Sequence, residues 1–224
     1  MRVRTRTGVE LCIRPLRPDD RVREIAFINS LSERTRFLRV LAPLRFLPPH
    51  LLDQLMDVDY DARMAFVATI MHDGVEEFIG VARYGPTDEP RTVEMAITVT
   101  DAWQRRGIAR PLLQQLIRYA RARGYLRMCG YVLPENHPML ALARTFGFQV
   151  CYSPGEHLTH ISLDLMKAAS TDPASSGVPA LRADAPCVVP AATPRSPPDA
   201  ASDGSGSWPP SFAQARGCVC RSLH

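Results

Sequence analysis

The stretch from Trp103 to Pro111, Trp-Gln-Arg-Arg-Gly-Ile-Ala-Arg-Pro, constrains the fold of this chain more than any other, because it determines where a helix can begin. The apolar run Met95–Val99 directly before it predicts a strand. Proline fits an α-helix only in the first turn, so Pro111 predicts a helix that starts at about Ala109 or Arg110. The chain is therefore expected to pass from a strand through a basic, glycine-containing turn into a helix.

This turn has the features of an anion site. The N–H groups of Arg106 through Ala109 are expected to gather at the helix N-terminus, where unpaired donors and the helix dipole attract anions. Gly107 allows a ligand to approach the backbone, and the arginines add positive charge. Neither G-x-x-x-x-G-K-[ST] nor a G-x-G-x-x-G opening a βαβ unit is present, so nucleoside triphosphate and dinucleotide sites lack their signatures. The alternative is an ordinary arginine-rich turn before a surface helix.

Composition divides the chain of 224 residues into two parts. Residues 168–224 hold nine of the 20 prolines and show no sustained apolar period, so they predict a disordered tail after a domain of residues 1–167. The tail could bind a partner through Trp208-Pro209-Pro210, although a solvated extension is the simpler interpretation. Its four arginines and four aspartates cancel, so the net charge of +4 lies on the domain and is too small and scattered to suggest nucleic-acid binding.

Several features indicate a reducing, cytoplasmic location. Three of the six cysteines fall within expected strands, where a thiol acts as a small buried hydrophobe, and the tail pair Cys218-x-Cys220 has no second pair with which to form a metal site. No apolar run reaches the roughly 20 residues of a membrane span, and the N-terminus lacks the apolar region of a secretory signal. The chain has a single lysine, Lys167, beside 26 arginines.

Hydrophobic periodicity and turn residues predict an α/β fold in the order β-α-α-α-β-β-β-α-β-α-β-β. Its sheet is expected to be mixed, antiparallel at first and parallel across the helix that follows the basic turn. The expected elements are a strand from Val9 that ends at Pro15, a helix capped by Asp19 or Asp20, a helix with a capping box from Ser30 to Glu33, a helix after Pro48-Pro49, strands at 64–71 and 77–84 joined at Asp73-Gly74, a strand at 92–99, a helix from about Ala109 that ends at Gly124, a strand at 126–133, a helix capped by Asn136 that ends at Gly147, and strands at 148–152 and 159–165.

Gln104-x-x-Gly107-x-Ala109 resembles the acyl-CoA pyrophosphate motif, Q/R-x-x-G-x-G/A, of the GCN5-related N-acetyltransferase (GNAT) superfamily. The order of elements over residues 9–165 is also similar to that superfamily, whose fold has a mixed, mostly antiparallel central sheet flanked by helices. Three segments resemble the bacterial Pat-type protein lysine acetyltransferases, namely Arg14–Asp20, Leu31–Arg39 and Asp57–Val67. The CoA-ligase-like or cyclic-nucleotide-binding domain that often accompanies that branch has no counterpart in this sequence.

Acyl transfer to an amine requires a base, because a lysine ammonium with a pKa of about 10.4 must lose a proton before it attacks. Glu94 is the candidate base, since it opens an apolar strand where desolvation would raise the pKa of its carboxyl. The resemblance also implies that the catalytic glutamate of the family lies here, acting directly or through water. The alternative is a solvent-facing strand end in which Glu94 pairs with Arg91 or another arginine.

The resemblance further implies a set of cofactor contacts. The strand that carries Ile97 and Val99 diverges from its neighbour in this superfamily, the gap takes the pantetheine arm, and an amide near Val99 polarises the thioester carbonyl. The pyrophosphate is held mainly by backbone N–H groups of the basic turn. The implied acetyl-CoA contacts are Ile97, Val99, Gln104, Arg105, Arg106, Gly107, Ile108, Ala109, Arg110 and Asn136.

Asn136 also suits a plain helix cap, and both roles are compatible. The sequence departs from the common pattern at Ala143, where many members of the superfamily carry a tyrosine that protonates the departing thiolate. Tyr131 and Tyr152 are possible substitutes, although a packing role is the simpler interpretation. The thiolate could also leave unassisted, because a thiol pKa near 8.5 permits it.

Two further clusters have both a functional and a structural interpretation. Asp57, Asp59, Tyr60 and Asp61 form an acidic stretch that could attract a cationic acceptor or could be a solvated turn. His157-x-x-His160 has the spacing of a metal pair but no third ligand, so surface histidines are expected and no metal site is predicted.

The predicted function is that of an acetyl-CoA-dependent N-acetyltransferase, an acyltransferase that transfers an acetyl group directly to an amine in a ternary complex. A protein lysine is the favoured acceptor because of the Pat-like segments. A small-molecule amine acceptor is the first alternative, and a catalytically weak acyl-CoA sensor is the second. No nucleic acid or membrane partner is expected.

Overall fold

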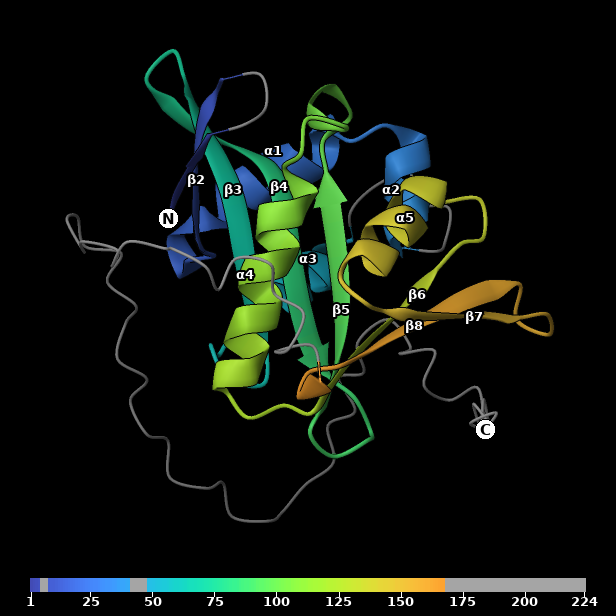
Figure 1. The fold of residues 1–224 in the computed structure, drawn as a ribbon. Coiled ribbons are helices and arrows are strands. Elements are labelled where there is room, and N and C mark those ends of the chain that lie inside the picture. The colour runs from blue at the N-terminus through green and yellow to red at the C-terminus, as the bar shows by residue number, and fades with distance from the viewer. Residues whose placement is uncertain (5–7, 41–47, 168–224) are drawn as a thin grey trace.

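An eight-stranded mixed sheet forms the centre of the structure, in the order β1-β2-β3-β4-β5-β6-β8-β7 (Figure 1). The computed structural model describes residues 1–4, 8–40 and 48–167, so the predicted disordered tail of residues 168–224 lies outside the described residues. The strands are β1 (Arg2–Arg4), β2 (Glu10–Pro15), β3 (Met64–His72), β4 (Val75–Pro86), β5 (Thr92–Val99), β6 (Arg127–Val132), β7 (Gln149–Ser153) and β8 (Leu158–Asp164). The helices are α1 (Arg21–Ser30), α2 (Glu33–Val40), α3 (Pro49–Met56), α4 (Ala109–Ala122) and α5 (His137–Thr145), with short 3₁₀ turns η1 (Pro18–Asp20) and η2 (Asp101–Trp103).

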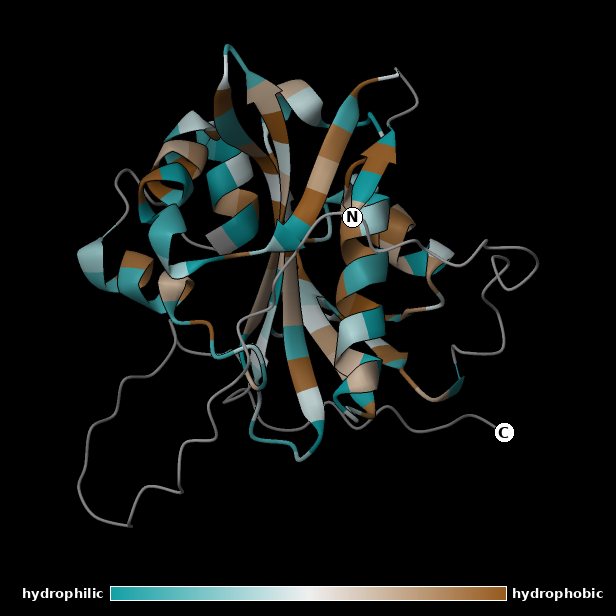
Figure 2. Ribbon diagram, turned by 90° about the vertical axis from the view of Figure 1, so that its left-hand side faces the viewer, coloured by the Kyte–Doolittle hydropathy of each residue, from teal (hydrophilic) through white to brown (hydrophobic). Residues whose placement is uncertain are grey.

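Helices cover both faces of this sheet. Seen edge-on, the sheet lies between α4 on one side and the α1–α3 group on the other (Figure 2). Alternate residues of β3 divide between the two sides, because successive side chains of a strand point to opposite faces. Phe66 packs into the core under α4, whereas Ala65 and Val67 pack into the smaller core under α1.

The predicted order of elements is confirmed from β2 onward, as is the mixed sheet; among the strands described, β5 and β6 alone pair in parallel. The helix after the basic turn begins at Ala109 and buries Leu112, Leu113 and Leu116 completely. Asp73 and Gly74 have φ values of 49° and 80°, the signs that a tight type I′ hairpin turn requires. Local turn and capping chemistry therefore placed most boundaries within one or two residues.

Two local expectations are wrong, and one strand has no counterpart among the predicted elements. That strand is β1, whose three residues show no apolar alternation; it is held by pairing with β2 and by packing of Val3 against the core. The cap of α2 comes from Ser32, whose Oγ accepts a hydrogen bond from the Thr35 amide at 3.2 Å, because Ser30 is still the last residue of α1. Asp20 precedes α1 but makes no capping bond to it.

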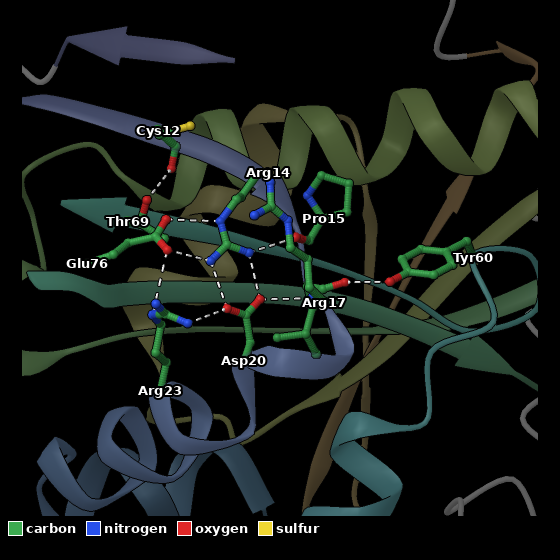
Figure 3. A network of polar contacts seen from close by, with 10 residues as sticks. Cys12, Arg14, Pro15, Arg17, Asp20, Arg23, Tyr60, Thr69 and Glu76 are labelled. Carbon is green, nitrogen blue, oxygen red and sulfur yellow. Dashed lines mark hydrogen bonds and ion pairs between the residues drawn. The ribbon is translucent and has the colours of Figure 1, made fainter. Parts of the chain in front are cut away.

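The carboxylate of Asp20 instead joins a buried ion-pair network (Figure 3). The Arg14 guanidinium on β2 donates to both Asp20 oxygens, at 2.6 and 2.8 Å, and to both Glu76 oxygens on β4, at 2.9 and 2.7 Å. Burial alone would raise the pKa of Asp20, but the hydrogen bonds from Arg14 and from the Arg17 amide lower it overall. The network fastens the start of α1 to the sheet.

Candidate active site

The parallel strands β5 and β6 part directly after Glu94. Their register pairs only residues 92–94 with 127–129. Beyond that point β5 continues beside β4 as far as Val99, while β6 continues beside β8 as far as Val132 (Figure 1). The structure thus contains the strand divergence that the resemblance implied. Among the residues that the structure describes, one edge of β5 has no ladder partner just beyond the candidate base.

A cleft of about 850 Å³ opens at this end of β5, between α2, the basic turn and α5. Its lining brings together nine of the ten predicted acetyl-CoA contacts. These are Ile97, Val99, Gln104, Arg105, Gly107, Ile108, Ala109, Arg110 and Asn136. Arg106 and Glu94 are not among the lining residues, so the cleft holds the predicted donor contacts while the candidate base lies outside its lining.

The basic turn presents its backbone to this cleft. Arg105 and Gly107 both have left-handed φ values, 58° and 87°, and a Cβ added to Gly107 would meet no atom within 4 Å. The N–H groups of residues 105–110 donate no hydrogen bond to any part of the chain that the structure describes. Ile108, only 2% exposed, anchors the turn in the core. Successive unpaired amides at a helix start form an anion-binding concavity.

Aromatic rings hold two arginine side chains of the turn. The Arg106 guanidinium lies 4.9 Å from the centroid of the Trp103 ring. The Arg110 guanidinium lies 5.2 Å from the Phe146 ring and donates to Thr145 Oγ1 at 3.3 Å. These contacts keep positive charge beside the unpaired amides, which favours a phosphate-bearing ligand.

The Gln104 side chain ties the turn to α2. Its amide donates to the Val99 carbonyl and to Thr35 Oγ1, both at 3.2 Å. Asp101 reinforces the link by accepting hydrogen bonds from the Ser32 hydroxyl and from Thr35 Oγ1, both at 2.8 Å. Sequence reasoning missed Ser32 and Thr35 as partners of this segment, because they lie 66 to 69 residues from Asp101 and Gln104 along the chain.

Glu94 is half-buried on β5 and stands in register with Cys129 of β6. Burial raises the pKa of its carboxyl, and the charge of Arg39 on α2 opposes that rise. The pairing with Arg91 that the sequence left open is wrong, since the Arg91 guanidinium donates to the Gly124 carbonyl at 2.7 and 3.0 Å. Within the described residues the Glu94 carboxylate makes no hydrogen bond.

Arg39 lines the cleft, and its positive charge is the one that lowers the pKa of Glu94. Burial lowers its pKa to about 10, helped by the like charge of Arg83, so Arg39 remains cationic at pH 7. Arg83 itself is buried and forms an ion pair with buried Glu24 of α1. The candidate base therefore lies beside a layer of buried charges that joins α1 and α2 to the sheet.

Replacing Arg39 by glutamine should shift the acidic limb of the pH–rate profile to higher pH. Arg39 stabilises the carboxylate form of Glu94, so its removal raises the pKa of that group further, and a base works only above its pKa. The profile is measured as kcat/KM between pH 5 and 9. Arg34→Gln is the matched control, because exposed Arg34 lines the same cleft without being among the charges that act on Glu94. If the acidic limb of the pH–rate profile did not move in Arg39→Gln, the effect of Arg39 on the pKa of Glu94 would be contradicted.

Asn136 has the capping role that the sequence allowed. Its side-chain oxygen accepts from the Met139 amide at 3.3 Å, and the residue also lines the cleft. Ala143 is completely buried and does not line the cleft, so the usual tyrosine position offers no proton donor. Tyr131 is half-buried on β6, and Tyr152 is 50% exposed on β7.

The acidic stretch at 57–61 is an ion-paired turn and does not line the cleft. Asp59 accepts from the amides of Asp61 and Arg63, both at 2.8 Å. Asp57 and Asp59 also lie within 3.7 Å of the Arg63 guanidinium. These contacts favour the structural interpretation of the stretch.

Within residues 1–4, 8–40 and 48–167 there is no group of three or more His, Cys, Asp or Glu residues that could hold a metal ion. His157 is exposed and His160 half-buried. No helix in the same residues is long and apolar enough to cross a membrane.

A strand pair that parts beside a half-buried carboxylate, with a basic turn of unpaired amides lining the neighbouring cleft, fits the arrangement that the resemblance implies for an acyl-CoA-dependent transferase. The model of the Acetyltransferase (GNAT) family matches residues 33–148, more than half of the chain. The chain therefore belongs to the GNAT family and is an N-acetyltransferase, as the resemblance predicted.

Individual proteins agree with this assignment. "Acetyltransferase PA5475" of Pseudomonas aeruginosa is 41% identical over 141 residues, 63% of this chain and 76% of the relative. The L-methionine sulfoximine/L-methionine sulfone acetyltransferase of the same species is 33% identical over 96 residues, 41% of this chain and 56% of the relative. The crystal structure of the GNAT domain of S. lividans PAT superposes with a TM-score of 0.67 at 30% identity, covering 73% of this chain and 96% of that chain.

Replacing Gly107 by valine should raise the KM for acetyl-CoA at least tenfold. A branched side chain at a φ of 87° strains the turn and covers the amides that face the cleft. Gly74→Val is the matched control, because Gly74 also has a positive φ of 80° and an added Cβ there would meet no atom within 4 Å, but it lies in the β3–β4 hairpin. Equal KM values in the two variants would show that the turn does not bind the donor.

Proposed function

We propose that this chain acetylates lysine side chains of proteins, using acetyl-CoA as the donor, by direct transfer in a ternary complex. The observation that carries the proposal is the placement of Glu94 at the point where β5 and β6 part, next to a cleft that ends in the basic turn. The Pat-like segments, and the similarity to the S. lividans PAT domain over 96% of its length, support a protein lysine as acceptor.

In the proposed mechanism the backbone amides of residues 105–110 hold the pyrophosphate of the donor. Its pantetheine arm lies along β5 at Ile97 and Val99 and beside Asn136. Glu94 accepts a proton from the acceptor ammonium, directly or through water. The resulting amine attacks the thioester carbon, the C–N bond forms, and the C–S bond breaks with release of CoA thiolate. The nitrogen then gives its second proton to water and the thiolate takes a proton from water, so the products are the neutral amide and free CoA thiol.

We also propose the cytoplasm as its compartment, because neither Cys12 nor Cys129 takes part in a disulfide within the described residues.

A small-molecule amine is the second candidate acceptor. The relative of Pseudomonas aeruginosa that acetylates L-methionine sulfoximine and L-methionine sulfone is 33% identical over 96 residues, which favours an amino-acid-like acceptor. That alignment covers 41% of this chain, so it supports this candidate less than the S. lividans PAT similarity supports a protein lysine.

The test incubates the full chain with acetyl-CoA and a panel of lysine-bearing proteins, polyamines, aminoglycosides and amino acids, and follows thiol release. Lys167 is the sole lysine of the chain, so a Lys167→Arg enzyme removes self-modification from an acetyl-lysine blot. Release with proteins alone supports the proposal. Release with small amines alone supports the second candidate, and tight CoA binding without release from any acceptor would identify an acyl-CoA sensor instead.

A further inference from the structure

Tyr131 and His160 form a ring pair on the sheet face that carries Glu94. Glu94 is in register with Cys129, and Tyr131 lies two residues further along β6, so its side chain points to the same face. His160 is the register partner of Tyr131 on β8, and the two ring centroids lie 5.3 Å apart. Both residues are half-buried, on the face opposite to the core that α4 and α5 cover.

Negative charge surrounds this ring pair from three separate elements. Glu94 on β5, Glu89 in the β4–β5 loop and Glu156 in the β7–β8 turn all act on the Tyr131 hydroxyl. Glu89 and Glu156 also act on His160, opposed there by Arg127, which forms an ion pair with Glu89 at 3.3 Å. Against these three carboxylates stand two guanidinium groups, that of Arg127 and that of Arg39, which acts on Glu94, so one net negative charge remains around the two aromatic rings.

Both rings are uncharged at pH 7. Burial raises the pKa of Tyr131 to about 12, and the neighbouring carboxylates add to the rise. Burial also lowers the pKa of the His160 imidazole below its ordinary value of 6.5. A neutral aromatic surface within a ring of carboxylates attracts an organic cation through the quadrupole of the ring and through the field of the carboxylates.

We propose that the Tyr131–His160 pair is the docking site of the acceptor, a primary alkylammonium group such as a lysine side chain, immediately before Glu94 takes its proton. This inference rests on the proposed function and adds the location and chemistry of the acceptor site. The alkyl stem packs on the rings and the ammonium points toward Glu94. The acceptor therefore reaches the thioester from the β6–β8 side, whereas the donor occupies the cleft beside α5.

Kinetics of two variants at Tyr131 test the site. Tyr131→Leu should raise the KM for the acceptor about tenfold and leave the KM for acetyl-CoA within twofold, because only the ring is lost. Tyr131→Phe keeps the ring and should stay within about threefold of wild type, which separates cation binding from any role of the hydroxyl. Tyr152→Leu on β7 is the matched control, since Tyr152 pairs with Thr159 and lies on the other face of the sheet. An unchanged acceptor KM in Tyr131→Leu would overturn the site, as would an equal rise in both KM values.

A binding measurement separates failure of this site from failure of the proposed function, because it needs no turnover. Titration of the wild-type chain with n-butylammonium should shift the His160 imidazole resonance, assigned by its absence in His160→Asn, to saturation. The same titration of folded Tyr131→Leu should shift it about tenfold less readily. Saturable binding without thiol release from any acceptor would keep the site and reject the enzymatic function. An imidazole resonance that does not move in the wild type would reject the site.

Discussion

Replacing Glu94 by glutamine should lower kcat by about two to four orders of magnitude while leaving the Kd for acetyl-CoA unchanged. The amide has the same shape as the carboxyl but cannot accept a proton from the acceptor ammonium. Donor binding is expected to persist because Glu94 does not line the cleft in which the predicted donor contacts meet. The rate is measured by thiol release at saturating donor and acceptor, and the Kd by calorimetry.

Glu77→Gln provides the matched control for this change. Glu77 also lies on a strand, β4, but its side chain is 52% exposed and pairs with His72 in the β3–β4 hairpin. We expect its kcat to equal that of the wild type. If Glu94→Gln kept full turnover, the base would have to be another group and the proposed mechanism would be wrong.

Replacing Arg14 by leucine should destabilise the fold by about 3–5 kcal/mol, which corresponds to a fall in Tm on the order of 10 °C. Arg14 is 4% exposed and is the main partner of Asp20, which is 1% exposed (Figure 3). Without the guanidinium, the Asp20 carboxylate stays buried and keeps the hydrogen bond from the Arg17 amide at 2.8 Å, but its only ion pair is then the longer one with Arg23, at 3.2 Å. Chemical denaturation at pH 7 measures the loss of free energy of unfolding.

Two further variants show whether the buried Asp20 carboxylate, left without Arg14, causes this loss of stability. Arg14→Leu combined with Asp20→Asn should recover part of the stability, because the second change removes the unpaired buried charge. Arg21→Leu removes an ion pair of similar length, 2.7 Å to Asp53, but the two side chains are 47% and 63% exposed. We expect that surface pair to contribute less than about 1 kcal/mol. An equal loss in Arg14→Leu and Arg21→Leu would show that burial does not matter here.

Features that depend on neighbouring residues could be predicted from the sequence, whereas features that depend on contacts between distant residues could not. The start of α4, its end at Gly124 and the hairpin turn at Asp73-Gly74 follow from single residues that restrict their own backbone. Nine of the ten predicted donor contacts line one cleft, because eight of them lie between Ile97 and Arg110 on a strand, turn and helix that are consecutive in the chain.

Only the tertiary structure decided which charges and rings meet. The side chain of Arg39 influences the pKa of Glu94 because α2 packs on β5. Neither segment contains a sequence pattern that predicts this contact. Gln104 binds Thr35 and Tyr131 meets His160 for the same kind of reason, since strand register and helix packing bring together residues that are 69 and 29 positions apart. At Asp20 a distant contact prevails over a local one, because the carboxylate expected to cap α1 instead pairs with the buried Arg14 of β2. Backbone preferences act within a few residues and can be predicted from sequence. Electrostatic and packing energies depend on distance in space, and the folded sheet alone defines that distance.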